Sequence, residues 1–190
     1  DSLAITFSAG PEIRILTLGL LKEISLESVN RLASSINGRV VESIGMNDHR
    51  SQVEALDAIL ESQPDLIIMA GGTDQGATRP IQKLVELVLQ ACRLMPKNKI
   101  PIMIYAGNQA LAKTVKERLE STIHVFPAPN IHPSIDQENL PPAQEILAQV
   151  VAEIRSKQFE GLPNLRKICS IPPIPSSHAF SRVIRYLSMR

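Results

Sequence analysis

Stretches typical of buried strands alternate with stretches typical of amphipathic helices through most of this 190-residue chain. Five apolar runs of strand length recur, and apolar residues at helical spacing follow each one. The runs lie at residues 13–21, 39–46, 65–70, 100–106 and 123–128. Successive strand-then-helix units join parallel strands through right-handed crossovers. The pattern therefore predicts an α/β fold, a three-layer sandwich around a mainly parallel five-stranded sheet.

The run at residues 65–70, "DLIIMA", is the most continuously apolar of the five. Such a strand belongs in the centre of a sheet that helices cover on both faces. A central third strand fits the order 2-1-3-4-5 of flavodoxin-like folds, in which ligands bind beyond the carboxyl ends of strands one and three. We therefore expect the loops after Leu21 and after Ala70 to form the walls of a crevice.

Local signals predict where several helices begin and end. Ser25 is expected to be the N-cap of the helix after the first sheet strand, and Gly38 to end that helix. Pro80 is expected at a helix start, where its missing N–H costs nothing. Another helix should begin at Asn108 or Gln109.

The alternation stops after Gly161. We expect residues 1–160 to form one α/β domain, with an additional short strand at residues 3–8. Residues 161–190 are expected to form a proline-rich linker, "SIPPIPSSH", and the start of a basic helix. The ends of the sequence suggest a fragment, with that helix leading to a missing domain.

The charge of the chain is unevenly distributed. Fifteen of the 20 Lys and Arg residues and all 19 Asp and Glu residues precede Arg166, which gives residues 1–165 a net charge of −4. A domain with this charge is a poor nucleic-acid binder, so we expect no nucleic-acid partner. The five basic residues from Arg166 onward are expected to pack against a missing element or to stay solvated.

Cysteine use and hydropathy bear on location. Cys92 and Cys169 have no paired spacing, which favours a reducing compartment over a disulfide framework or a structural zinc site. No apolar run approaches the roughly 20 residues that span a bilayer, and no signal peptide opens the sequence. We expect a cytoplasmic protein without a membrane partner.

The loop after the third sheet strand is the main candidate site. In "DLIIMAGGTDQGATRP", residues 65–80, the candidate binding residues are Gly71, Gly72, Thr73, Asp74, Gly76 and Thr78. The spacing of Gly71 and Gly76 invites comparison with a phosphate-binding P-loop, but Ala77 stands where the lysine is expected. Two like charges about 4 Å apart repel by roughly 4 kcal/mol at a dielectric near 20, so Asp74 opposes a phosphate there.

Two interpretations of this turn stay open. In the structural one, Gly71, Gly72 and Gly76 adopt positive φ while Asp74 and Thr78 cap the following helix. In the functional one, Asp74 accepts hydrogen bonds from ligand hydroxyls or amines, or from a partner's arginine.

Polar residues also follow the fourth and fifth sheet strands. Gly107 and Asn108 follow the fourth, and Asn130 with His132 lies in a proline-stiffened loop after the fifth. Three polar loops at one sheet edge predict a site more strongly than one alone. No set of residues has the spacing of a catalytic triad or a metal centre, so we expect no catalytic residue, no metal and no cofactor.

Three stretches resemble a known family. "EIRILTLGLLKEISLESVNRLA", "PDLIIMAGGTDQGATRPI" and "IPIMIYAGNQALAKTVKERL" resemble the MutL accessory proteins of glutamate mutase (methylaspartate mutase), which are unrelated to the mismatch-repair protein of the same name. The most specific mark is residues 70–74, with residues 106–108 downstream. The family's pattern usually has a glycine where Gln75 stands and an asparagine where Ala77 stands, and Gln75 would block a site that needs bare backbone.

The resemblance implies an inner α/β segment of a larger protein in the sugar-kinase, Hsp70 and actin ATPase superfamily, associated with an adenosylcobalamin-dependent mutase. We expect this segment itself to be a non-catalytic interaction or ligand-sensing domain, whose partner is the mutase or the missing ATPase domain. The alternative is a flavodoxin-like small-molecule binding domain or enzyme with a hydroxyl- or amino-bearing ligand.

Overall fold

The protein is built around a five-stranded, all-parallel sheet with the strand order β3-β2-β4-β5-β6. The computed structural model describes residues 3–7, 11–74, 76, 78–158 and 161–189. The sheet strands are β2 (Ile13–Gly19), β3 (Gly38–Gly45), β4 (Leu66–Met69), β5 (Ile102–Tyr105) and β6 (His124–Pro127). Numbered within the sheet alone, this is the order 2-1-3-4-5, so the predicted topology is confirmed.

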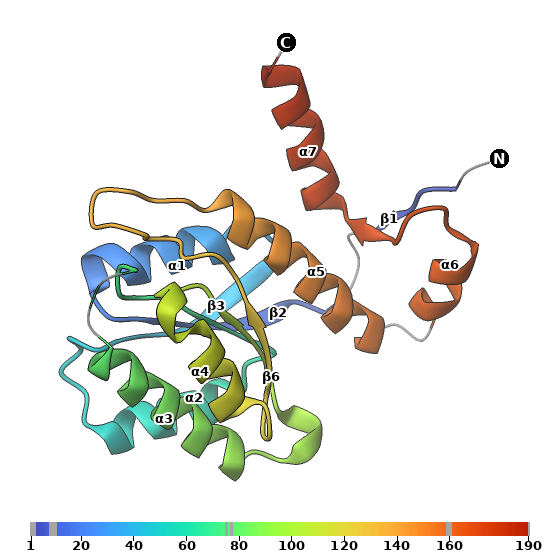
Figure 1. Cartoon of the computed structure of the whole chain (residues 1–190). Helices are drawn as coiled ribbons and strands as arrows, with labels where there is room; N and C mark the ends of the chain where they lie inside the picture. The colour runs from blue at the N-terminus through green and yellow to red at the C-terminus, as the bar shows by residue number, and fades with distance from the viewer. Residues whose placement is uncertain (1–2, 8–10, 75, 77, 159–160, 190) are drawn as a thin grey trace.

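Helices cover both faces of the sheet, which confirms the three-layer sandwich (Figure 1). One face carries α1 (Glu27–Ala33) and α5 (Pro141–Gln158), and the other carries α2 (Gln52–Ser62), α3 (Arg79–Leu94) and α4 (Gln109–Leu119). A short π-helical turn, Lys22–Leu26, precedes α1, and a 3₁₀ turn, Lys97–Lys99, precedes β5.

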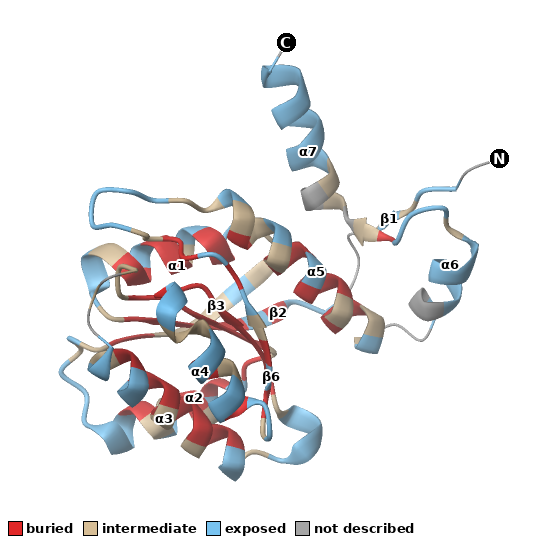
Figure 2. Cartoon of the chain, in the orientation of Figure 1, coloured by how far each residue is buried: buried red, intermediate tan, exposed pale blue. Residues whose placement is uncertain are grey.

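The core consists of two apolar clusters, one on each face of the sheet (Figure 2). Along β2, Leu16 and Leu18 enter one cluster while Ile13 and Ile15 enter the other. This is the alternation that a pleated strand requires. All four residues of β4 are buried, as expected for the central strand. The packed sheet therefore gives the loops at its carboxyl edge a rigid base.

Two predicted helix limits are wrong. Ser25 lies inside the π-helical turn, and its hydroxyl accepts from the Leu21 N–H at 2.9 Å, so it closes the turn before α1 and does not cap the helix. Gly38 begins β3, because α1 ends four residues earlier at a Ser34 cap. Pro80 near the start of α3 and Asn108 as the N-cap of α4 are confirmed.

The two terminal segments meet beside the sandwich. The early strand β1 (Thr6–Phe7) does not join the main sheet but pairs in parallel with β7 (Ile174–Pro175) in the proline-rich stretch. Just before β7 along the chain, α6 (Leu162–Ile168) forms where the sequence pattern predicted no helix. The basic helix is present as α7 (Ser176–Ser188), and it projects from the body (Figure 1). Whether residues 161–190 lead to another domain stays a prediction.

No helix in the described ranges is both long enough and apolar enough to cross a bilayer.

Candidate functional site

The structure brings together the loops that follow β4, β5 and β6 at the carboxyl edge of the sheet. Gly71 accepts a hydrogen bond from the Asn108 N–H through its carbonyl, at 3.2 Å. Asn130, from the third loop, donates its side-chain amide to the Gly72 carbonyl at 3.0 Å. Asn108 and Asn130 are both nearly inaccessible to solvent. The predicted convergence of these loops is therefore present in the structure.

Asp74 joins the three loops. Its Oδ1 accepts from the Gln109 backbone N–H at 3.1 Å and from the Asn130 side-chain amide at 2.9 Å. Its own N–H donates to the Pro133 carbonyl at 3.2 Å. Gln109 is the first residue of α4, where the backbone N–H groups attract negative charge. The carboxylate therefore occupies a position in which many α/β proteins hold a ligand's anion.

The charge of Asp74 acts on a neighbouring phenol. Tyr105, at the end of β5, is 1% exposed and donates to the Asn108 carbonyl at 3.2 Å. Burial raises the pKa of Tyr105 strongly, and the nearby carboxylate of Asp74 raises it further. Tyr105 is therefore a neutral hydrogen-bond donor that holds the start of α4 in place.

Two glycines allow the loops to approach this closely. Gly71 has φ +139°, and a Cβ there would lie 2.5 Å from Cγ of Leu20, in the loop after β2. A Cβ on Gly107 would lie 2.7 Å from the Gly71 carbonyl oxygen. Neither position accepts a side chain without movement of its neighbour. The glycines thus serve the packing of loop on loop.

Part of the structural interpretation of this turn is wrong. Asp74 caps α4, the helix after next, and does not cap α3. Thr78 is the N-cap residue of α3 but makes no side-chain capping bond. Gly71 and Gly72 have positive φ, but Gly76 does not. Gln75 and Ala77, on which the comparison with phosphate loops and with the family pattern depended, lie outside the described residues.

Gly76 and Thr73 form a small turn of their own. The Gly76 N–H donates to the Thr73 carbonyl at 2.8 Å, and a Cβ on Gly76 would lie 2.7 Å from the Thr73 hydroxyl oxygen. These two candidate residues therefore shape the loop that presents Asp74. Whether any of the candidate residues binds a ligand stays a prediction.

A cluster of Ser28, Arg31, His132 and Glu138 extends the polar edge toward α1. The Ser28 hydroxyl lies 2.7 Å from His132 Nε2, donates to Glu138 Oε1, and accepts from Arg31 Nη2 at 2.9 Å. The pairing of Ser28 with His132 suggests a nucleophile, but Ser28 is fully buried and contacts three partners. The cluster therefore ties α1 to the loop between β6 and α5.

This cluster continues the contacts made by Asp74. The His132 backbone N–H donates to Asn130 Oδ1 at 3.0 Å, so one chain of hydrogen bonds runs from the start of α4 to α1. The sequence pattern indicates His132 as a polar loop residue, but Arg31 and Glu138 were not predicted. The three-residue spacing of Ser28 and Arg31 on one helix face was an available signal, whereas nothing in the sequence distinguishes Glu138. Among the described residues, no group of three His, Cys, Asp or Glu side chains is placed to hold a metal ion.

Replacing Glu138 by glutamine should flatten the acid dependence of stability. Hydrogen bonds from Arg31 and then Ser28 hold the pKa of Glu138 below its ordinary 4.5. The folded chain thus binds fewer protons than the unfolded chain between these two pKa values. The stability that the ionised Glu138 carboxylate contributes is complete above about pH 4.5 and is lost as the pH falls through the folded-state pKa. We expect about 1 kcal/mol, because Arg31 is half exposed and solvent screens the pair.

Urea unfolding at pH 7, 5, 4 and 3 measures this effect. Glu117→Gln is the control, since the Glu117 carboxylate is exposed and lies 3.8 Å from the Lys113 ammonium on the same helix. Wild-type and Glu138→Gln proteins that lose stability in parallel on acidification would contradict the assignment.

The fold and these loops define a class of protein: a doubly wound, parallel α/β protein in which an internal carboxylate ties together the loops at the carboxyl edge of the sheet. Within that class the chain belongs to the MutL protein family, whose family model matches residues 1–190. The family predicted from residues 70–74 and 106–108 is therefore confirmed. The chain is also similar to "Protein MutL" of Clostridium tetanomorphum, with 24% identity over 184 residues. That alignment covers 95% of this chain and 37% of the relative.

Proposed function

We propose that this chain is a non-catalytic protein-interaction module of a MutL accessory protein, and that its partner is an adenosylcobalamin-dependent mutase such as glutamate mutase. The observation that supports this role is the position of Asp74, whose Oδ1 accepts from the first N–H of α4 and from Asn130. These donors would otherwise be available to an anionic ligand. Because an internal carboxylate already accepts from these donors, the carboxyl edge of the sheet is suited to holding its loops together.

Electrostatics also support the absence of nucleotide chemistry at this edge. A phosphate drawn to the start of α4 would meet the charge of Asp74 at hydrogen-bond range, with repulsion of roughly 4 kcal/mol at a dielectric near 20. The network that runs on to Ser28 and Glu138 makes the loop surface rigid. A preorganised surface binds a protein partner with a smaller loss of conformational entropy.

The test is direct binding of the chain to purified glutamate mutase. Biolayer interferometry with residues 1–190 should give saturable binding with a Kd on the order of micromolar, about −8 kcal/mol. ATP and GTP should leave the melting temperature of the chain unchanged. The non-catalytic assignment would be refuted if the chain hydrolysed ATP and Asp74→Ala abolished this activity. The control variant, Asp136→Ala, should then stay fully active.

The second candidate is a small-molecule site for a hydroxyl- or amino-bearing ligand. Its support is that both hydrogen bonds from described residues to the Asp74 carboxylate end on Oδ1, which leaves Oδ2 without a partner within that part of the chain. The same melting assay with a panel of amino acids, amines and sugars separates the two candidates. A stabilising compound whose effect disappears in Asp74→Ala but persists in Asp136→Ala would favour the small-molecule site.

A further inference from the structure

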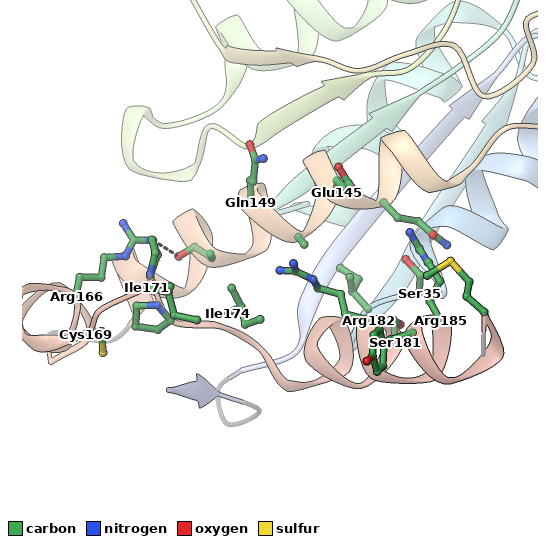
Figure 3. Close-up of a pocket in the computed structure, with 18 residues that line it drawn as sticks. Ser35, Glu145, Gln149, Arg166, Cys169, Ile171, Ile174, Ser181, Arg182 and Arg185 are labelled. Carbon is green, nitrogen blue, oxygen red and sulfur yellow. Dashed lines mark hydrogen bonds between the residues drawn. The ribbon is translucent and has the colours of Figure 1, made fainter. Parts of the chain in front are cut away.

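A groove of about 1080 Å³ lies between α5 and the C-terminal segment, on the far side of α5 from the sheet (Figure 3). The outward side of α5 forms the floor, and α7 with the proline-rich stretch lies opposite it. Ser35 and Ile36, at the end of α1, close one part of it. None of the described residues that line the groove belongs to the loops at the carboxyl edge of the sheet.

The floor of the groove is apolar and is formed by short side chains. Ala148 and Ala152 lie one turn apart on α5, and short side chains at this spacing let another backbone come close. Ile171, Pro172 and Ile174 add an apolar wall on the opposite side. A surface of this kind favours an occupant with an apolar face.

The rim of the groove is basic. Arg166, Arg182 and Arg185 line it, against the single acidic residue Glu145. Arg182 and Arg185 are exposed and form no ion pair with any residue that the structure describes. Arg166 donates to the Ala152 carbonyl at 3.5 Å, which keeps its charge beside the floor. The sequence holds no Asp or Glu after Arg166 to neutralise these side chains.

The size of the groove matches a short helix. Two turns of an α-helix, about 11 Å long and about 10 Å wide, fill roughly 850 Å³. The groove volume of about 1080 Å³ is close to this figure, which already includes the side chains of the helix. This volume lies at the upper end of the range of small-molecule pockets, roughly 300 to 1,000 Å³, and is compatible with a short polypeptide helix.

We propose that this groove is a docking site for an acidic amphipathic helix of a protein partner. Its apolar face would lie on Ala148 and Ala152, and its carboxylates would pair with Arg182 and Arg185. The inference rests on the proposed function, because it names the surface through which the module holds its partner. A second copy of the chain is a poor occupant, since its α7 would bring two further arginines to a basic rim.

The test uses two synthetic amphipathic helices of about 15 residues that share a leucine face and carry either glutamates or lysines. Fluorescence anisotropy with the whole chain should show the glutamate peptide binding at least about tenfold more tightly. Arg182→Glu with Arg185→Glu should reverse that preference. The control, Lys113→Glu with Lys116→Glu on α4, has the same spacing and charge change and should leave it intact.

A second variant tests the groove without changing its charge. Gln149→Trp adds a bulky side chain at an exposed position of α5 that lines the groove, and it should weaken binding of the glutamate peptide about tenfold while the melting temperature stays the same. Backbone NMR shifts on adding the peptide should appear at Ala148 and Ala152.

Several outcomes would overturn the inference. These are equal affinity for the two peptides, equal effects of the two charge reversals, tighter binding to anionic lipid vesicles than to the glutamate peptide, or a dimer that Arg182→Glu with Arg185→Glu disrupts. The peptide measurements do not use the mutase. Failure of the mutase to bind the wild-type chain would therefore count against the proposed function alone.

Discussion

Replacing Gly71 by alanine is expected to lower the free energy of unfolding by about 2 to 6 kcal/mol, from about 1 to 3 for backbone strain and about 1 to 3 for overpacking. The strain arises because Gly71 has φ +139°, a conformation that an L-residue rarely adopts. The overpacking arises because the new Cβ would lie 2.5 Å from Cγ of Leu20. Urea or thermal unfolding measures the loss.

Gly161→Ala is the matched control for this substitution. A Cβ at Gly161 meets nothing within 4 Å, and its φ of −78° suits alanine. We expect a change within about 0.5 kcal/mol for this control. Similar losses of unfolding free energy in Gly71→Ala and Gly161→Ala would show that the loops after β2 and β4 do not pack tightly at Gly71.

Replacing Asp74 by alanine is expected to cost about 2 to 4 kcal/mol, below the sum of about 3 to 6 kcal/mol for two lost hydrogen bonds to a carboxylate at about 1.5 to 3 each. The buried Asn130 amide keeps its bond to the Gly72 carbonyl, which limits the loss. The Gln109 N–H at the start of α4 loses its partner. Its hydrogen exchange should therefore accelerate markedly, while the amides of β4 stay protected.

Two further variants separate charge from geometry in this experiment. Asp74→Asn keeps an acceptor oxygen and should lose less stability than Asp74→Ala. Asp136→Ala removes an exposed carboxylate in a neighbouring loop and should change stability by less than about 0.5 kcal/mol. Unchanged exchange at Gln109 in Asp74→Ala would mean that the carboxylate does not hold the start of α4.

The fold could be predicted from the sequence because its signals are local and repeated. The apolar run 65–70 identified the central strand, since only a strand covered on both faces needs continuous apolar residues. The parallel order then followed from the alternation of strands and helices. The predicted strand order also places Asp74, Asn108 and Asn130 at the carboxyl edge of the sheet, where the structure has them.

The partners of those residues could not be predicted in the same way. In the structural interpretation of the turn, Asp74 caps the helix that follows it directly, whereas its carboxylate reaches α4, 35 residues away in the sequence. The bond from Ser28 to Glu138 spans 110 residues. Such pairings depend on how neighbouring loops lie across the sheet edge, and no short-range pattern encodes them. The helix α6 was not predicted for a different reason, because the prolines around it favour extended chain.

The pairing of β1 with β7 has a mechanical consequence. Both connections to the sandwich pass through this narrow ribbon, in which Thr6 lies opposite Ile174 and Phe7 opposite Pro175. The strands run in the same direction, so tension applied upstream of β1 and downstream of β7 would pull them past one another in shear. The few hydrogen bonds of the ribbon, such as the one from the Ile174 N–H to the Ile5 carbonyl at 3.3 Å, would carry that load first. The five-stranded sheet would feel no force until the ribbon had opened.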